Sequence, residues 1–418
     1  MNLIKTSVLT GLSTFIKIIS GFVINKMIAI YIGPSGLALI GQLQNFITIT
    51  TTYANGAISN GIIKYVSEYK DEEAKKAKII SSGLRISLFC SVLIGIILLL
   101  FCKKISFFVL KTDVYYQIIL LFGFTIILFA LNAFLLAVLN GLREIKKFIT
   151  INILSSIFGL LLTCLLIVFY QLKGALIALV INQSVVFFIT LIYILKSKWF
   201  NAKYFFSGYD KQYVLKLLGF SLMAITTVST YPVSLIIIRK YIGHNLSWDQ
   251  AGYWEGLWRI SEVYLMLITT SLSVYYLPRL SELKHKIELR KEIFYVYKIV
   301  IPVVLVMSTC IFIFRPFIIR ILFTSDFMPM LPLFKYQLMG DVLKISGWIL
   351  SYLLVAKAKI KIFITTEIIF SISFVLFSIF FINIVGLKGV TMAYAFNYLL
   401  YLLTMIVIFR KILIKKNG

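Results

Sequence analysis

Charged residues, histidine and cysteine are all scarce in this chain of 418 residues. Asp, Glu, Lys and Arg make up 14% of it, whereas soluble domains are roughly a quarter charged. The two histidines and four cysteines follow no metal-ligand or CxxC-type spacing. No metal site, disulfide framework or cofactor is therefore expected. The sequence also has no Walker A pattern that would bind ATP and no loop long enough for a soluble catalytic domain.

Apolar residues dominate instead, at 60% of the chain. A spanning helix needs about 20 largely apolar residues. Such runs predict an all-α integral membrane protein with about twelve transmembrane helices, near residues 7–32, 37–66, 81–102, 115–139, 148–170, 174–195, 215–238, 251–277, 294–315, 333–355, 362–383 and 389–410.

The formal net charge of +26 has a topological explanation, so no nucleic-acid partner is expected. Basic residues concentrate in alternate loops, for example at 143–147, 284–291 and 357–361. The intervening loops hold few, such as Lys173 and Lys388. Because lysine and arginine favour cytoplasmic loops, we expect a multi-pass protein of the bacterial inner membrane with both termini in the cytoplasm.

An internal repeat organises the sequence. Phe148-Ile149-Thr150 recurs as Phe363-Ile364-Thr365, and Leu172-Lys173-Gly174 recurs as Leu387-Lys388-Gly389, both at an offset of 215 residues. The second half carries about six extra residues near 245–250. Because six helices return the chain to the same side, the pattern predicts two parallel six-helix lobes, residues 1–205 and 206–418, around a central cleft.

Ionisable residues inside the predicted spans are the candidate functional residues, because burying them in a bilayer is costly. Lys17 lies near the middle of the first span, and Lys26 lies nearer its outer end, where it could simply extend to the interface. Candidate substrate-binding cations are Lys17, Lys26, Arg259 and Lys344, and candidate proton- or sodium-coupling acids are Glu255, Glu262, Asp341 and Glu367.

Spacing places several of these side chains on shared helix faces. Glu255, Arg259 and Glu262 follow i, i+4 and i+7, which predicts one face and either a self-neutralising triad or a substrate site. Gln42, Asn45 and Thr52 share a face of the second span, which either packs on other helices or lines a wet cleft that binds sugars. Four tryptophans at 248, 254, 258 and 348 fit interfacial anchoring.

Five longer segments of the chain are distinctive: IGPSGLALIGQLQNF (32–46), NGIIKYVSEY (60–69), SWDQAGYWEG (247–256), SVYYLPRLSEL (273–283) and QLMGDVLKISGWILSYLLVAKA (337–358). They resemble the polysaccharide-repeat flippases, which handle O-antigen and enterobacterial common antigen (lipid III) units and share a superfamily with multidrug and toxic-compound extrusion proteins. The family's charged positions match at Lys17, Lys26, Lys64, Arg239, Lys240, Asp341, Lys344 and Glu367. Arg259 departs from the pattern, and Glu262 replaces an aspartate.

The resemblance implies a transporter rather than an enzyme. Its expected substrate is an oligosaccharide on undecaprenyl diphosphate, moved from the cytoplasmic to the periplasmic leaflet by alternating access. It also implies contact with membrane lipid and, as partners, a glycan polymerase and a chain-length regulator of polysaccharide or lipopolysaccharide biosynthesis. Two alternatives stay open on the residues alone: a cation-coupled multidrug exporter, and a membrane glycan polymerase or glycosyltransferase, which would be an enzyme with catalytic residues that the sequence does not reveal.

Overall fold

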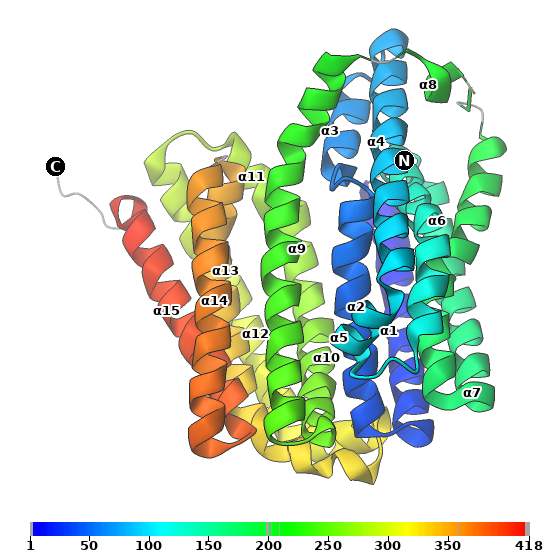
Figure 1. Cartoon of the computed structure of the whole chain (residues 1–418). Helices are drawn as coiled ribbons and strands as arrows, with labels where there is room; N and C mark the ends of the chain where they lie inside the picture. Colours follow the sequence, from blue (N-terminus) through cyan, green and yellow to red (C-terminus); the bar gives the residue numbers. More distant parts are fainter. Residues whose placement is uncertain (1–2, 198–199, 202, 209, 358, 414–418) are drawn as a thin grey trace. The chain divides into compact units, whose positions relative to one another are not determined.

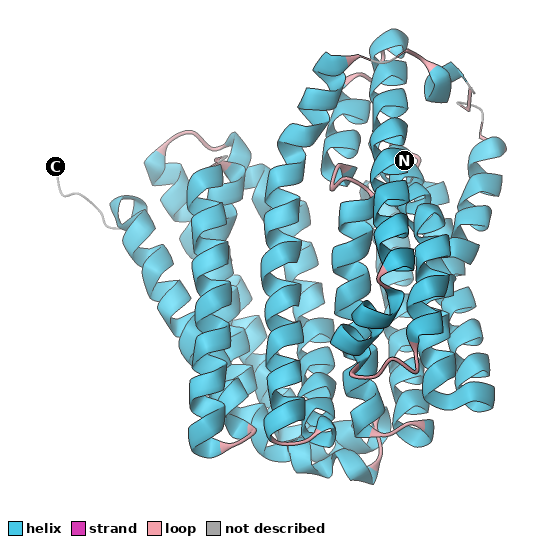
Figure 2. Ribbon diagram, in the orientation of Figure 1, coloured by secondary structure: helices cyan, strands magenta, loops and turns pink. Residues whose placement is uncertain are grey.

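The computed structural model describes residues 3–197, 200–201, 203–208, 210–357 and 359–413. Helices form nearly all of this described part, and no strand occurs in it (Figure 2). Nine of its helices are long and apolar enough to cross a membrane. Many large apolar side chains, such as Leu100 and Phe169, are exposed, as expected where the bilayer is the solvent. The predicted all-α, multi-pass membrane fold is confirmed, while the count of twelve spans stays a prediction.

The described residues of the first half form eight helices (Figure 1). They are α1 Leu3–Tyr31, α2 Pro34–Ala54, α3 Ser59–Glu68, α4 Glu73–Leu100, α5 Cys102–Leu110, α6 Tyr116–Gly141, α7 Ile145–Leu195 and the short α8 Lys203–Phe206. The predicted second span is interrupted between α2 and α3, where Gly56 and Ala57 both take positive φ. Left-handed backbone ends a helix, so this span is two helices rather than one.

The second half continues with α9 Lys211–Asn245, α10 Trp248–Ser271, a π-helical turn η1 Leu272–Tyr276, α11 Leu277–Glu282 and α12 Lys286–Leu322. It ends with a 3₁₀ segment η2 Ser325–Leu333, α13 Phe334–Ala356, α14 Ile360–Val385 and α15 Lys388–Leu413. The extra residues predicted near 245–250 extend α9 to Asn245 and start α10. Ser247 caps α10, because its hydroxyl accepts from the backbone N–H of Gln250 at 3.1 Å.

Helix α7 is two antiparallel arms joined at Gln171, whose φ of 47° and ψ of −127° break the helix. A Cβ on Gly174 would lie 1.9 Å from the Leu166 carbonyl oxygen, and one on Gly159 would lie 2.8 Å from the Asn182 side chain. Residues so far apart in one straight helix could not meet, so the chain folds back here (Figure 1). The two predicted spans 148–170 and 174–195 correspond to these arms.

The backbone repeats itself at the offset of 215 residues found in the sequence. Helix α6 ends at Gly141 and α7 begins at Ile145, while α13 ends at Ala356 and α14 begins at Ile360. Gly386, at the position equivalent to Gln171, also takes an unusual φ of 66° and ψ of −148°, and it joins α14 to α15. The helices α6 and α7 are therefore the structural counterparts of α13, α14 and α15.

Two compact units make up the chain: residues 1–32 with 39–233, and residues 33–38 with 234–418. In the first, α3, α4 and α6 pack together around Ile62, Ile79 and Phe134. In the second, α15 packs along α13 and α14. Residues 33–38 belong to this second unit, where the Ser35 backbone N–H donates to Asp249 at 3.1 Å. The lobe boundary near residue 205 and the central cleft stay predictions.

Candidate substrate and coupling site

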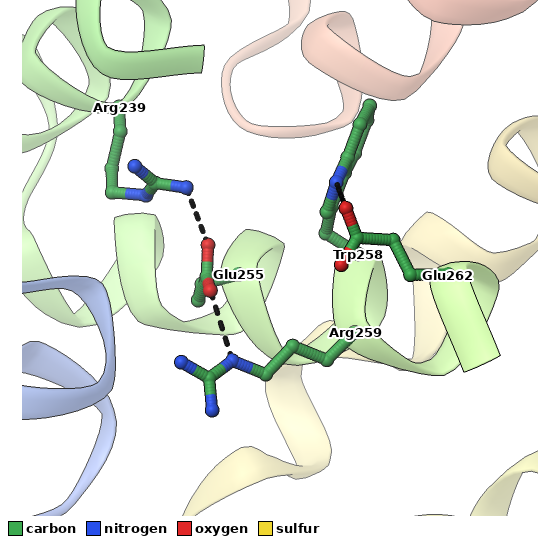
Figure 3. A network of polar contacts seen from close by, with 5 residues as sticks. All are labelled: Arg239, Glu255, Trp258, Arg259 and Glu262. Carbon is green, nitrogen blue, oxygen red and sulfur yellow. Dashed lines mark hydrogen bonds and ion pairs between the residues drawn. The ribbon is translucent and has the colours of Figure 1, made fainter. Parts of the chain in front are cut away.

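The second unit contains a group of buried charged side chains, and its first part is a carboxylate held by two arginines (Figure 3). Glu255 on α10 accepts from Arg239 on α9 at 2.5 Å and from Nε of Arg259 on α10 at 2.9 Å. The side chains of Arg239, Glu255 and Arg259 are 2%, 6% and 14% exposed. Such burial is tolerated because each charge has an opposite partner with good geometry. The three together carry one net positive charge.

Arg259 approaches Glu255 through Nε. Figure 3 shows its two terminal nitrogens directed away from that carboxylate. A guanidinium can bind one anion through Nε and a second through its terminal N–H groups, because it has five donors in a planar fork. Glu255 therefore fixes the orientation of the Arg259 guanidinium through its Nε.

Glu262 lies one turn beyond Arg259 but takes a different partner. Its Oε1 accepts from the indole N–H of Trp258 at 2.9 Å (Figure 3), and the residue is more exposed than Glu255. The triad predicted on one face of this helix is thus divided: Glu255 and Arg259 pair, and Glu262 bonds a tryptophan instead. Glu262 remains within electrostatic reach of Glu255, Arg259 and Lys344.

Asp341 on α13 forms the centre of a second buried group. Its Oδ2 accepts from the Ser261 hydroxyl at 2.8 Å and from the Tyr264 hydroxyl at 2.7 Å. Its Oδ1 accepts from the Tyr394 hydroxyl at 2.8 Å and, at 3.5 Å, from the Gln337 amide. Neutral donors from α10, α13 and α15 thus surround a fully buried carboxylate. Hydrogen bonds of this kind stabilise the charged form of the carboxylate.

Lys344 lies one turn along α13 inside a cage of aromatic rings. Its Nζ is 4.7 Å from the ring centroid of Trp348, 5.5 Å from Tyr398, and 5.8 Å from both Trp258 and Tyr394. Cation–π attraction strengthens when the ammonium is desolvated. Asp341, Glu262 and Glu367 also act on Lys344 electrostatically.

The predicted site residues therefore fall into two sets. The second unit contains six of them: Arg259, Lys344, Glu255, Glu262, Asp341 and Glu367. Within this unit the ring of Trp258 packs against the ring of Tyr394. Lys17, Lys26, Gln42, Asn45 and Thr52 belong to the first unit. Of these, Gln42 is buried, Lys17 is exposed, and Lys26, Asn45 and Thr52 are half-buried. That this second set joins the substrate site stays a prediction.

The tryptophan prediction was wrong at two positions. Trp254 and Trp258 are 1% and 4% exposed, so they lie inside the second unit rather than at a membrane interface. Trp258 contacts Trp254, Phe374 and Tyr394 through its ring and bonds Glu262 through its N–H. Sequence reasoning also missed the tyrosines of α15 and Arg239 as the partner of Glu255.

A usable signal for the missed tyrosines was present. Tyr394, Tyr398 and Tyr401 follow i, i+4 and i+7, which is one face of a helix. All three are buried, and their rings pack in sequence along α15. The partner of Arg239 was harder to find, because Glu255 lies on another helix and helix periodicity relates only residues of one helix.

Solved structures of similar fold identify the class. One is an inward-facing multidrug resistance MATE family transporter of the MOP superfamily, with a TM-score of 0.78 and 14% identity over 96% of both chains. Another is a MOP superfamily transporter from Pyrococcus furiosus, with a TM-score of 0.74 and 15% identity over 97% of this chain and 95% of that one. The chain thus has the fold of these membrane transporters.

Sequence comparison then gives the family. The family model described as "Polysaccharide biosynthesis protein" matches residues 3–284. The curated proteins named lipid III flippase from Escherichia coli (strain K12) and Shigella flexneri are each 32% identical over 405 residues, which is 96% of this chain and 96% of theirs. The chain belongs to the polysaccharide biosynthesis protein family, and the predicted membership among its flippases is confirmed. It is a transporter and not an enzyme.

Proposed function

We propose that this protein moves an oligosaccharide linked to undecaprenyl diphosphate from the cytoplasmic to the periplasmic leaflet by alternating access. The observation that carries the proposal is the match along nearly the whole length of two proteins named lipid III flippase. Both termini are then cytoplasmic, and a glycan polymerase and a chain-length regulator act on the product.

The second unit has side chains suited to such a substrate. A lipid-linked diphosphate is an anion with a large polar headgroup, and Arg259 presents its terminal N–H groups away from Glu255. Paired N–H donors of a guanidinium bind phosphate oxygens in a bidentate manner. Amides and hydroxyls on α2, at Gln42, Asn45 and Thr52, are the proposed sugar contacts, with Lys17, Lys26 and Lys344 as further cations.

The carboxylates of the same unit are the proposed coupling groups. Glu255, Glu262, Asp341 and Glu367 are candidates for a proton or sodium ion whose movement drives the cycle. A multidrug exporter of the same fold is the second candidate, favoured by the likeness to MATE transporters. The buried set of Arg239, Glu255 and Arg259 argues against it, because this set carries one net positive charge, which repels an organic cation.

The test is the identity of the lipid that accumulates. In cells that lack their own lipid III flippase, we expect this chain to restore surface glycan and to clear the cytoplasmic lipid-linked intermediate. Arg259→Ala should reduce clearance, and Arg259→Lys should restore it only partly, because lysine lacks the planar fork. Arg279→Ala, on an exposed arginine, is the matched control and should clear normally. Drug resistance with no change in lipid intermediates would overturn the proposal in favour of the exporter.

A further inference from the structure

The carboxylates in the second unit are not equivalent, and their contacts separate them. Seven ionisable side chains form the group: Arg239, Arg259 and Lys344 are cations, while Glu255, Glu262, Asp341 and Glu367 are carboxylates. Counted as charged, they leave one negative charge in excess. An uncompensated charge in a low-dielectric interior is costly, so one added positive charge would neutralise the group.

Two of the four carboxylates are already satisfied. Glu255 has an arginine on each oxygen, and both guanidinium groups bind it directly. Asp341 accepts hydrogen bonds on both oxygens from four side chains. A proton added to either carboxylate would have to displace an ionic or hydrogen-bond donor. These two carboxylates are therefore held in place by their partners. A proton or sodium ion is better accommodated at one of the other two carboxylates, Glu262 or Glu367.

The remaining two carboxylates lie on different helices around Lys344. Glu367 on α14 is half-buried and interacts with Lys344 electrostatically. Glu262 on α10 is exposed, and a single indole N–H donates to its Oε1. Glu262 is thus the most exposed of the four carboxylates, and the hydrogen bond that it accepts comes from a neutral donor, which is easily released when the carboxylate is neutralised.

We propose that Glu262 is the side chain at which this group of charges receives and releases its one compensating charge, either a proton or a sodium ion. Lys344 on α13 and Arg259 on α10 favour the charged carboxylate, while Glu255 opposes it. Glu367 on α14 and the tyrosines of α15 act on it through Lys344. Trp258 is a positioning residue, because its N–H fixes the carboxylate and its ring faces the Lys344 ammonium.

The inference rests on the proposed function for its biological meaning, but its test needs no substrate. The indole of Trp258 bonds Glu262, so a proton or sodium ion at this carboxylate changes the environment of the indole. Intrinsic tryptophan fluorescence of the purified full-length chain would be followed across a pH titration, and separately across a sodium titration at constant pH and ionic strength. A response in the pH series indicates a proton, and one in the sodium series indicates a sodium ion.

Four variants make the result specific. Glu262→Gln should abolish the response, and Glu262→Asp should retain it with a shifted midpoint, which also shows that the fold survives a change here. Glu367→Gln should keep the response with a shifted midpoint, because Glu367 acts on Glu262 through Lys344, and the exposed control Glu282→Gln should respond like the unmodified chain. A response that persists in Glu262→Gln, or that Glu367→Gln alone removes, would overturn the assignment. A response lost in Glu262→Gln with no effect on lipid-linked intermediates would instead contradict the proposed function.

Discussion

Removal of the Glu255 carboxylate should destabilise the protein strongly. Arg239 and Glu255 are almost fully buried, so Glu255→Ala leaves two guanidinium groups without the carboxylate that compensates them. Loss of one partner from a buried ion pair costs about 3–5 kcal/mol. For a folding unit of the size of residues 234–418, each kcal/mol lowers the midpoint of thermal unfolding by about 2–4 °C. We therefore expect a decrease on the order of 10 °C.

The assay is thermal unfolding of the purified protein in detergent, and two further variants test the reasoning. Arg259→Ala should cost less, on the order of 1 kcal/mol, because Arg259 is partly exposed and Glu255 keeps Arg239. The double variant Arg239→Met with Glu255→Leu should recover most of the loss, since apolar residues of similar volume can replace a buried pair. The pair would not be the stabilising contact we describe if Glu255→Ala had the same unfolding midpoint as the unmodified chain. The same conclusion would follow if the double variant had a midpoint no higher than that of Glu255→Ala.

Four other substitutions test separate features by the same unfolding measurement. Gln171→Gly should raise the midpoint, because a non-glycine residue at this backbone conformation costs about 1–3 kcal/mol, whereas Gly386→Ala should lower it. Gly252→Ala should also lower it, because the new Cβ would lie 1.9 Å from a backbone carbonyl oxygen at the start of α2. The hydrogen bond from Lys78 lowers the pKa of Asp210, so its stabilisation exists above the ordinary value near 3.8 and disappears as the pH falls through the lowered one. Asp210→Asn should therefore be less stable than the unmodified chain at neutral pH and equal to it in acid.

The sequence predicted the helices well because their signal is local. Apolar runs of about 20 residues are long and need no tertiary information, and the repeated tripeptides gave the offset at which the backbone later repeats. The break between α2 and α3 was missed, although Asn55-Gly56 is a typical turn signal. The polar face of this span and its apolar residues continued through the turn and concealed it.

The candidate site was predictable as a set of residues but not as a network. Charged residues stand out in an apolar chain, so Glu255, Arg259, Glu262 and Asp341 were found individually. Their partners were not predicted, because Arg239 binds Glu255 from another helix and Glu262 accepts a hydrogen bond from Trp258 instead of pairing with Arg259. Contacts of this kind depend on helix rotation and packing, which a hydropathy pattern leaves undetermined.

The internal repeat shows that the fold does not itself require these buried charges. At the offset of 215 residues, Asp341, Lys344 and Glu367 correspond to Ile126, Phe129 and Asn152, on helices with matching ends and a matching backbone break. Ile126 and Phe129 are buried apolar residues of the first unit. One copy of the repeat thus folds with the apolar residues Ile126 and Phe129 at the positions where the other copy buries Asp341 and Lys344. Because apolar residues stabilise such positions at least as well as ions do, a structural need does not explain the charges of the second unit. Their explanation has to be sought in what the protein binds and moves.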